Sequence, residues 1–141
     1  MKRYMIFKYV DDLSRNEPRN VGVVVFDGAD AVSRFDGEAS DGLPDLRRVR
    51  HRITASHAYR EWVKYWRTTL ENPGRIERSL EGLGAGDPRV IESLVGSSGQ
   101  EFYLEEGGEI LMDSEHLSLE ALGEDLFRRL VHEPEQHEQT D

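Results

Sequence analysis

The side chains with the clearest capacity for chemistry lie in a basic stretch between residues 47 and 67. Arginine guanidinium groups bind carboxylates and phosphates through paired hydrogen bonds, so a run of arginines can hold an acidic protein or a nucleic acid. Trp62, Tyr65 and Trp66 lie in the same stretch, and basic residues mixed with aromatic ones are typical of single-strand binders. A solvated helix face with tryptophans in the core gives the same pattern. The candidate interaction residues are Arg47, Arg48, Arg50, Arg52, Arg60, Lys64 and Arg67.

A second group, of acidic side chains, follows the first predicted strand. Asp11, Asp12 and Glu17 could supply two or three oxygen ligands to a hard cation, but they lack the regular ligand spacing of a calcium loop. A turn that carries solvated carboxylates is the favoured explanation. A small metal-dependent enzyme built around these residues and Asn20 is therefore one hypothesis.

The established catalytic patterns are absent from the sequence. The chain has no cysteine, which excludes disulfides, thiolate metal sites and a cysteine nucleophile. Its five histidines form no i, i+4 pair of the helical zinc type. Residues 96–99 (Gly-Ser-Ser-Gly) are one residue short of a nucleophile elbow, and the glycine-rich residues 82–86 follow no predicted strand. We therefore predict no catalytic residue, no metal ligand and no cofactor.

Charge is distributed unevenly along the chain, which has a formal net charge of −10 at pH 7. Residues 46–78 contain nine Arg or Lys residues and three Glu residues, whereas residues 101–141 contain thirteen acidic residues and two arginines. The overall excess of acidic residues argues against nucleic-acid binding over the whole surface of the protein. A second copy of the chain would carry an acidic region complementary to the basic stretch, so a homodimer is one candidate assembly.

Three strands are predicted in the first 35 residues, and antiparallel succession is the simplest arrangement for them. Residues 4–10 and 20–26 are rich in aromatic and β-branched side chains, and residues 31–35 can form a third strand. Asp27 and Gly28 form a natural turn pair before that third strand. Further along, residues 101–105 and 109–112 are predicted to form a β-hairpin around Gly107 and Gly108.

Helices are predicted in the middle and near the end of the chain. Apolar residues between 46 and 70 recur at near-helical spacing, with a break near residues 54–57, and Pro44 suits the first helical turn. Asp87 can cap a short helix over residues 88–95, and Ser118 can cap a last helix. The fold class is therefore α+β: a small antiparallel sheet, made of the N-terminal strands plus a later hairpin, packed against two to four helices.

The length of 141 residues fits a single domain. We predict that it spans residues 1–132, followed by a disordered acidic tail over residues 133–141. No run approaches the roughly 18 apolar residues that a membrane helix needs, and no signal peptide follows the opening residues. We therefore expect a cytoplasmic protein without a membrane partner.

The N-terminal residues resemble a bacterial family. The family's pattern is Tyr-Val-x-Asp followed by Glu-x-x-Asn-x-Gly-Val-x-x-Phe. The chain has Tyr9, Glu17, Asn20, Gly22 and Phe26 at the corresponding places, and residues 126–131 resemble the family's end. The chain is in this respect similar to the domain-of-unknown-function family three-zero-three-seven, over about residues 3–132 and most specifically over the first 26.

The resemblance implies a partner or antidote role for a kinase of the Hip persistence type, because members of the family are often encoded beside such kinases. A role of this kind would belong to a toxin–antitoxin or defence system. The motif also has a physical interpretation: Asn20 and Gly22 suit a turn bond and a close backbone approach, while Glu17 can accept bonds from nearby N–H groups. These motif roles are structural.

Three functions follow from the sequence. The first is a protein-interaction or regulatory module without catalytic activity, whose partner is another protein, such as the kinase, or a second copy of the chain. The second is a nucleic-acid-binding accessory protein that uses the basic and aromatic residues of 47–67. The third is the small metal-dependent enzyme around Asp11, Asp12 and Glu17.

Overall fold

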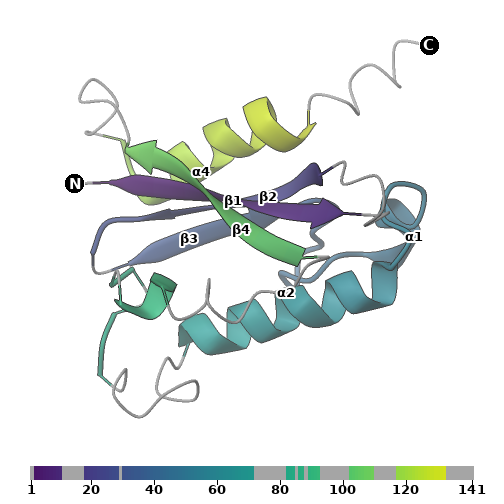
Figure 1. Ribbon diagram of the computed structural model, residues 1–141, viewed down its shortest axis with the longest axis horizontal. Helices are drawn as coiled ribbons and strands as arrows, with labels where there is room; N and C mark the ends of the chain where they lie inside the picture. Colours follow the sequence, from purple (N-terminus) through teal and green to yellow (C-terminus); the bar gives the residue numbers. More distant parts are fainter. Residues whose placement is uncertain are drawn as a thin grey trace.

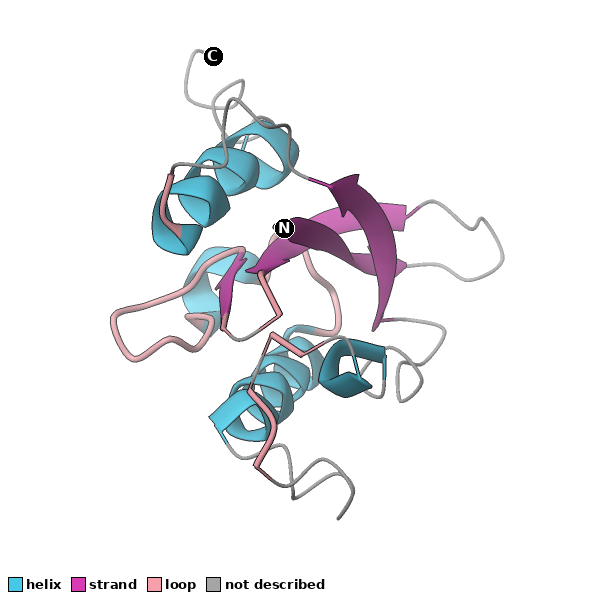
Figure 2. Ribbon diagram, turned by 90° about the vertical axis from the view of Figure 1, so that its left-hand side faces the viewer, coloured by secondary structure: helices cyan, strands magenta, loops and turns pink. Residues whose placement is uncertain are grey.

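The computed structural model describes residues 2–10, 18–28, 30–71, 82–84, 86–87, 89–92, 102–109 and 117–132. Its architecture is a four-stranded antiparallel sheet with helices on both faces, as Figures 1 and 2 show. The α+β class predicted from the sequence is therefore confirmed. None of the helices within these ranges is both long and apolar enough to cross a membrane.

The sheet consists of β1 (Arg3–Val10), β2 (Pro18–Phe26), β3 (Ala31–Phe35) and β4 (Phe102–Glu109), in the spatial order β3-β2-β1-β4. All three neighbouring pairs are antiparallel, as predicted for the first three strands. The register of β1 and β2 shifts where Phe7 faces Gly22 and Lys8 faces Asn20, so Val21 is an extra residue in β2. A bulge of this kind locally turns the backbone, and the Val21 carbonyl oxygen here accepts from the Asp36 amide at 2.7 Å and lies 3.2 Å from the Tyr59 hydroxyl.

The run Val21–Phe26 in β2 is buried along its whole length because helices cover both faces of the strand. On one face Val24 and Phe26 pack in a cluster with α2 (Ser56–Glu71). On the other face Val23 and Val25 pack against α4 (Leu119–Phe127) and the following π-helical turn η4 (Arg128–His132). Figure 1 shows α2 below the sheet and α4 above it. A strand covered on both sides is apolar continuously rather than alternately.

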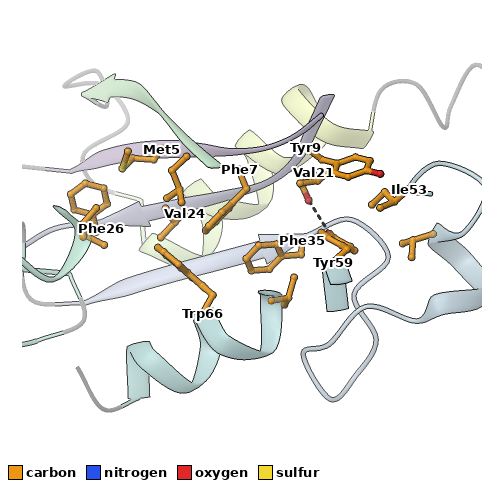
Figure 3. Close-up of a cluster of buried hydrophobic side chains, with 14 of the residues drawn as sticks. Met5, Phe7, Tyr9, Val21, Val24, Phe26, Phe35, Ile53, Tyr59 and Trp66 are labelled. Carbon is orange, nitrogen blue, oxygen red and sulfur yellow. Dashed lines mark hydrogen bonds between the residues drawn. The ribbon is translucent and has the colours of Figure 1, made fainter. Parts of the chain in front are cut away.

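Phe7 lies at the centre of the larger core cluster, which is drawn in Figure 3. Its ring centroid lies 4.5 Å from that of Phe35 and 4.6 Å from that of Trp66, with Trp62 at 5.4 Å. The Trp66 contact is edge to face, an arrangement favoured by the aromatic quadrupole. The tryptophans of the basic stretch therefore help to join the helix α2 to the sheet.

The break predicted near residues 54–57 is confirmed, since α1 (Leu46–Val49) ends before it and α2 begins at Ser56. The placement of Pro44 in the first helical turn is wrong. Pro44 instead bridges to Glu38, and Asp45 caps α1 by accepting a hydrogen bond from the Arg47 amide. Proline has no side-chain oxygen that could accept this amide bond, whereas the short Asp45 carboxylate does.

The cap predicted for the last helix is confirmed, because the Ser118 hydroxyl oxygen accepts a bond from the Ala121 amide. In the middle of the chain, residues 89–92 are helical, and the Asp87 carboxylate accepts a bond from the Arg89 amide, as expected of a cap. The predicted disordered tail lies outside the described residues, as does the second half of the predicted hairpin beyond residue 109.

The turn predicted at Gly107 and Gly108 is wrong, because β4 continues through both residues to Glu109. Gly108 pairs with Tyr4 and Glu106 pairs with Met5, so Gly107 is an extra residue in the strand. A Cβ atom at Gly107 would lie 2.0 Å from the ring of Tyr4. The glycine serves a bulge beside an aromatic ring, a role that a sequence pattern does not separate from a turn.

Candidate interaction surface

The seven basic residues predicted to bind a partner divide into two groups. Arg52 belongs to the first group, since its guanidinium binds both oxygens of the Asp36 carboxylate, at 3.0 Å from Nε and 2.8 Å from Nη2. Asp36 is 3% exposed. A planar guanidinium that meets a carboxylate in this two-bond geometry gives a strong, directional contact. Arg52 therefore fixes the chain after α1 to the end of β3.

Arg67 is also engaged within the fold. Its Nε donates to the Gly42 carbonyl at 2.9 Å and its Nη1 donates to the Ser33 hydroxyl at 3.0 Å. Its other terminal nitrogen pairs with the Glu38 carboxylate, and the guanidinium lies 5.3 Å from the centroid of the Phe35 ring. Arg67 thus ties α2 to β3 and to the loop that connects β3 with α1.

The second group forms the outward-facing basic surface. We define this surface by five residues on α1, just after it and on α2: Arg47, Arg48, Arg50, Arg60 and Lys64. All are exposed except Arg60, which is half-buried. Arg48 donates to the Glu38 carbonyl at 3.3 Å. For the side chains of the other four, the described part of the chain supplies no hydrogen bond or ion pair, so they are available to an outside partner.

Basic and aromatic residues occupy different flanks of α2. Residues that are three, four or seven apart share a helix face, which places Arg60, Lys64 and Arg67 together. Arg67 points to the loop around Gly42, so this is the flank beside that loop and α1. Trp62 points to β4, where its ring centroid lies 5.0 Å from that of Phe102, and Tyr65 follows it by three residues. Of the three aromatic residues in the stretch, Tyr65 is exposed, whereas Trp62 and Trp66 pack against Phe7.

Two acidic residues in the loop after β3, Asp36 and Glu38, shape this surface. Gly37 (φ 78°) and Gly42 (φ 82°) adopt the left-handed conformation and fold the loop back on itself. The Asp36 amide donates to the Val21 carbonyl at 2.7 Å, and the Glu38 carboxylate accepts from the Phe35 amide at 3.2 Å. The ion pairs Asp36–Arg52 and Glu38–Arg67 have a single signal in the sequence, namely that acidic residues shortly precede the run of arginines.

The residues shared with the family pattern have structural contacts. The Tyr9 hydroxyl accepts a hydrogen bond from the Ala55 amide at 3.2 Å, at the start of α2. Asn20 donates from Nδ2 to the Leu130 carbonyl at 3.0 Å, which joins β2 to the end of the last helix. Phe26 is buried in the core.

Gly22 has the closest surroundings of these motif residues. A Cβ atom there would lie 2.7 Å from the Arg34 carbonyl oxygen and 2.8 Å from the Phe35 ring. The close backbone approach expected of this glycine is therefore present. Glu17 lies outside the described residues, together with Asp11 and Asp12, the acidic group considered for a metal. Among the residues that are described, no group of three or more histidine or acidic side chains is arranged to hold a metal ion.

Tyr59 lies beneath the basic surface, where its hydroxyl contacts two backbone carbonyl oxygens. It donates to Asp36 at 2.9 Å, and it also lies 3.2 Å from the Val21 oxygen, the contact drawn in Figure 3. Burial raises the pKa of Tyr59 well above its ordinary value, and the nearby carboxylates of Asp36 and Glu38 raise it further. The phenol therefore stays neutral in the folded protein.

We expect Tyr59 to ionise only well above the ordinary tyrosine pKa of about 10 in an absorbance titration of the native protein. Because its folded-state pKa is raised, its contribution to stability is complete below the unfolded value of about 10 and is lost as the pH rises through the folded value. In Tyr59→Phe the late-ionising fraction should disappear, and the alkaline loss of stability should become less steep. An alkaline titration of the folded Tyr59→Phe variant that retains the same late-ionising fraction as the wild type would contradict this assignment.

Comparisons with known proteins give no match: no family model, no curated protein and no solved structure is similar to the chain.

Proposed function

We propose that the protein is an interaction module without catalytic activity, and that it docks an acidic protein partner on the basic surface of α1 and α2. The observation that carries this proposal is the division of the arginines. Arg52 and Arg67 are used by the fold, whereas Arg47, Arg50, Arg60 and Lys64 face outward without a partner among the described residues.

The charge distribution suits recognition of an acidic partner. The chain carries −10 overall, so the basic surface stands out against an acidic remainder. Such a dipolar molecule orients an approaching acidic protein, which raises the association rate at low salt. The surface also rests on ordered supports, namely the Asp45 cap and the Asp36–Arg52 pair, so that little ordering entropy is lost on binding.

A protein partner suits this surface better than a nucleic acid. Single-stranded nucleic acid binds by stacking its bases on aromatic rings beside the basic groups. Here Trp66 is 2% exposed, and Trp62 packs against Phe7 and Phe102 on the other flank of α2. The five basic residues therefore offer charge and paired hydrogen bonds, which carboxylates can use without stacking.

The resemblance to the domain-of-unknown-function family supports a more specific proposal. The partner would be a Hip-type kinase, and the protein would act as its companion or antidote. The chain would then bind the kinase in a stoichiometric complex and would not modify it. Co-expression with such a kinase should restore growth when the basic surface is intact.

The double substitution Arg47→Gln with Arg50→Gln should weaken the complex about fivefold at low salt, since each exposed charge pair in an interface contributes roughly 0.5 kcal/mol. The tagged protein is used to capture partners from its native host, and each captured partner is then purified for measurement of its association rate. A matched control, Arg128→Gln with Arg129→Gln, removes the same charge from the opposite helix layer and should change the affinity less than about twofold.

Three results would overturn the proposal. One is equal capture by the Arg47/Arg50 variant and the wild type. Another is capture that is abolished by nuclease treatment, which would assign the surface to nucleic acid. The third is an association rate that does not change with salt, because steering by the basic surface requires that dependence.

A further inference from the structure

The last helix ends close to the basic surface, although α4 covers the opposite face of the sheet. The link is the first part of β2. Asn20 donates to the Leu130 carbonyl at 3.0 Å, and its neighbour Arg19 donates to the Arg52 carbonyl at 3.1 Å. Figure 1 shows α4 running towards the end of the sheet at which α1 lies. The chain therefore leaves η4 at the α1 end of the molecule.

The residues that follow are acidic. Residues 133–141 contain four carboxylates and no Arg or Lys. Nine extended residues reach about 30 Å. The Leu130 oxygen and the Arg52 oxygen are linked through the side chains of Asn20 and Arg19 and their two hydrogen bonds. With the one Cα–Cα step between these two residues, this path spans roughly 20 Å at most. The segment is long enough to reach Arg52, which lies two residues from Arg50.

We propose that residues 133–141 dock on the basic surface of their own chain and compete there with the acidic partner. This inference rests on the proposed function, because it assigns the same surface to carboxylates. In this proposal residues 133–141 imitate the acidic partner, and their docking lowers the partner's apparent affinity for the basic surface. The occupant is the same molecule rather than a second copy, since the described chain ends within this segment's reach of Arg52, which neighbours the basic surface.

A short tether makes even a weak contact effective. A segment held by a short linker has an effective concentration of roughly 1 mM at its site. With an intrinsic dissociation constant of about 0.1 mM, it would then occupy the surface about nine-tenths of the time, and the partner's apparent affinity would fall about tenfold. Tail neutralisation should therefore strengthen partner binding by about that factor.

The absence of cysteine allows a direct test on the full chain. The variant Thr140→Cys carries a nitroxide spin label, and the backbone amides are observed by NMR in isotope-labelled protein. At about 50 mM salt the label should broaden the amide signals of Leu46–Val49, and at about 500 mM salt the broadening should largely vanish through screening. Amides of β4, at the far edge of the sheet, serve as an internal reference and should be much less affected.

Two controls decide between occupants. The tail-neutralised chain, with Glu133→Gln, Glu135→Gln, Glu138→Gln and Asp141→Asn, should lose the broadening. A mixture of isotope-labelled protein without the spin label and spin-labelled protein without the isotope should show none, because only contacts between two copies would be visible. Broadening in the mixture would assign the occupant to a second copy and overturn docking within one chain.

The inference and the proposed function can fail separately. If no broadening of Leu46–Val49 occurs at low salt, the docking is wrong, while loss of the partner in the Arg47/Arg50 variant would still support the interaction surface. If the segment docks but those substitutions leave partner capture unchanged, the docking stands and the partner binds elsewhere. An unchanged partner affinity after tail neutralisation would overturn the competition.

Discussion

Replacing Asp36 with Asn is expected to lower the free energy of unfolding by about 3 kcal/mol, because it removes the charged partner that Arg52 binds through two hydrogen bonds in a largely buried ion pair. The side chains of Asp36 and Arg52 are 5% and 13% exposed. The amide of Asn supplies one acceptor oxygen in place of the two that Arg52 uses. Urea unfolding followed by circular dichroism measures the loss.

A double-mutant cycle tests the cause of that loss. Asp36→Asn, Arg52→Met and the combined variant should give a coupling energy of at least about 1 kcal/mol, with the combined variant more stable than the sum of the single losses implies. Arg129→Met provides the matched control, since it breaks an exposed pair with Asp125 on α4 and should cost less than about 0.5 kcal/mol. Additive losses would show that the two side chains act independently.

Gly22→Ala is expected to destabilise the protein by about 3 kcal/mol, although it adds a single methyl group. The new Cβ atom would lie 2.7 Å from the Arg34 backbone oxygen and 2.8 Å from the ring of Phe35. Neither neighbour can move easily, because Arg34 is part of β3 and Phe35 is fixed in the core. Inserting a group into a packed interior forces shifts of this size.

Gly123→Ala is the matched substitution with the opposite expected sign. Gly123 lies within α4, and an added Cβ would have its nearest neighbours at 3.6 Å and 4.0 Å, which are ordinary contacts. Alanine in a helix interior is favoured over glycine by about 1 kcal/mol. Thermal unfolding of both variants beside the wild type should thus show a clear decrease for Gly22→Ala and an increase for Gly123→Ala. Similar losses in both would remove the steric explanation.

The elements that local chemistry determines could be predicted from the sequence. The three N-terminal strands, the break before α2 and the Ser118 cap each depend on residues close together in the chain. The continuation of β4 through Gly107 and Gly108 could not be predicted, because the bulge there depends on a neighbour that is distant in the sequence. The β4 bulge accommodates the ring of Tyr4, which is about one hundred positions away in the sequence.

The same distinction applies to the candidate surface. The sequence identifies a run of arginines but does not show which of them the fold uses. In the sequence, Arg52 and Arg67 cannot be distinguished from the neighbouring arginines. In the fold, the loop after β3 places Asp36 and Glu38 beside them. Helical periodicity, by contrast, is local, and it already separates Arg60 and Lys64 from Trp62 and Tyr65.

The sheet order also has a consequence for how the protein forms during synthesis. The strands β1, β2 and β3 lie within the first 35 residues, whereas β4 begins at Phe102 and α4 at Leu119. A nascent chain can pair its first three strands early. One edge of β1 and the face of β2 that carries Val23 and Val25 stay uncovered until β4 and α4 are synthesised. At roughly 5–20 residues per second this interval lasts several seconds. Translation speed and holdase chaperones should therefore affect the yield of folded protein more than they affect its final stability.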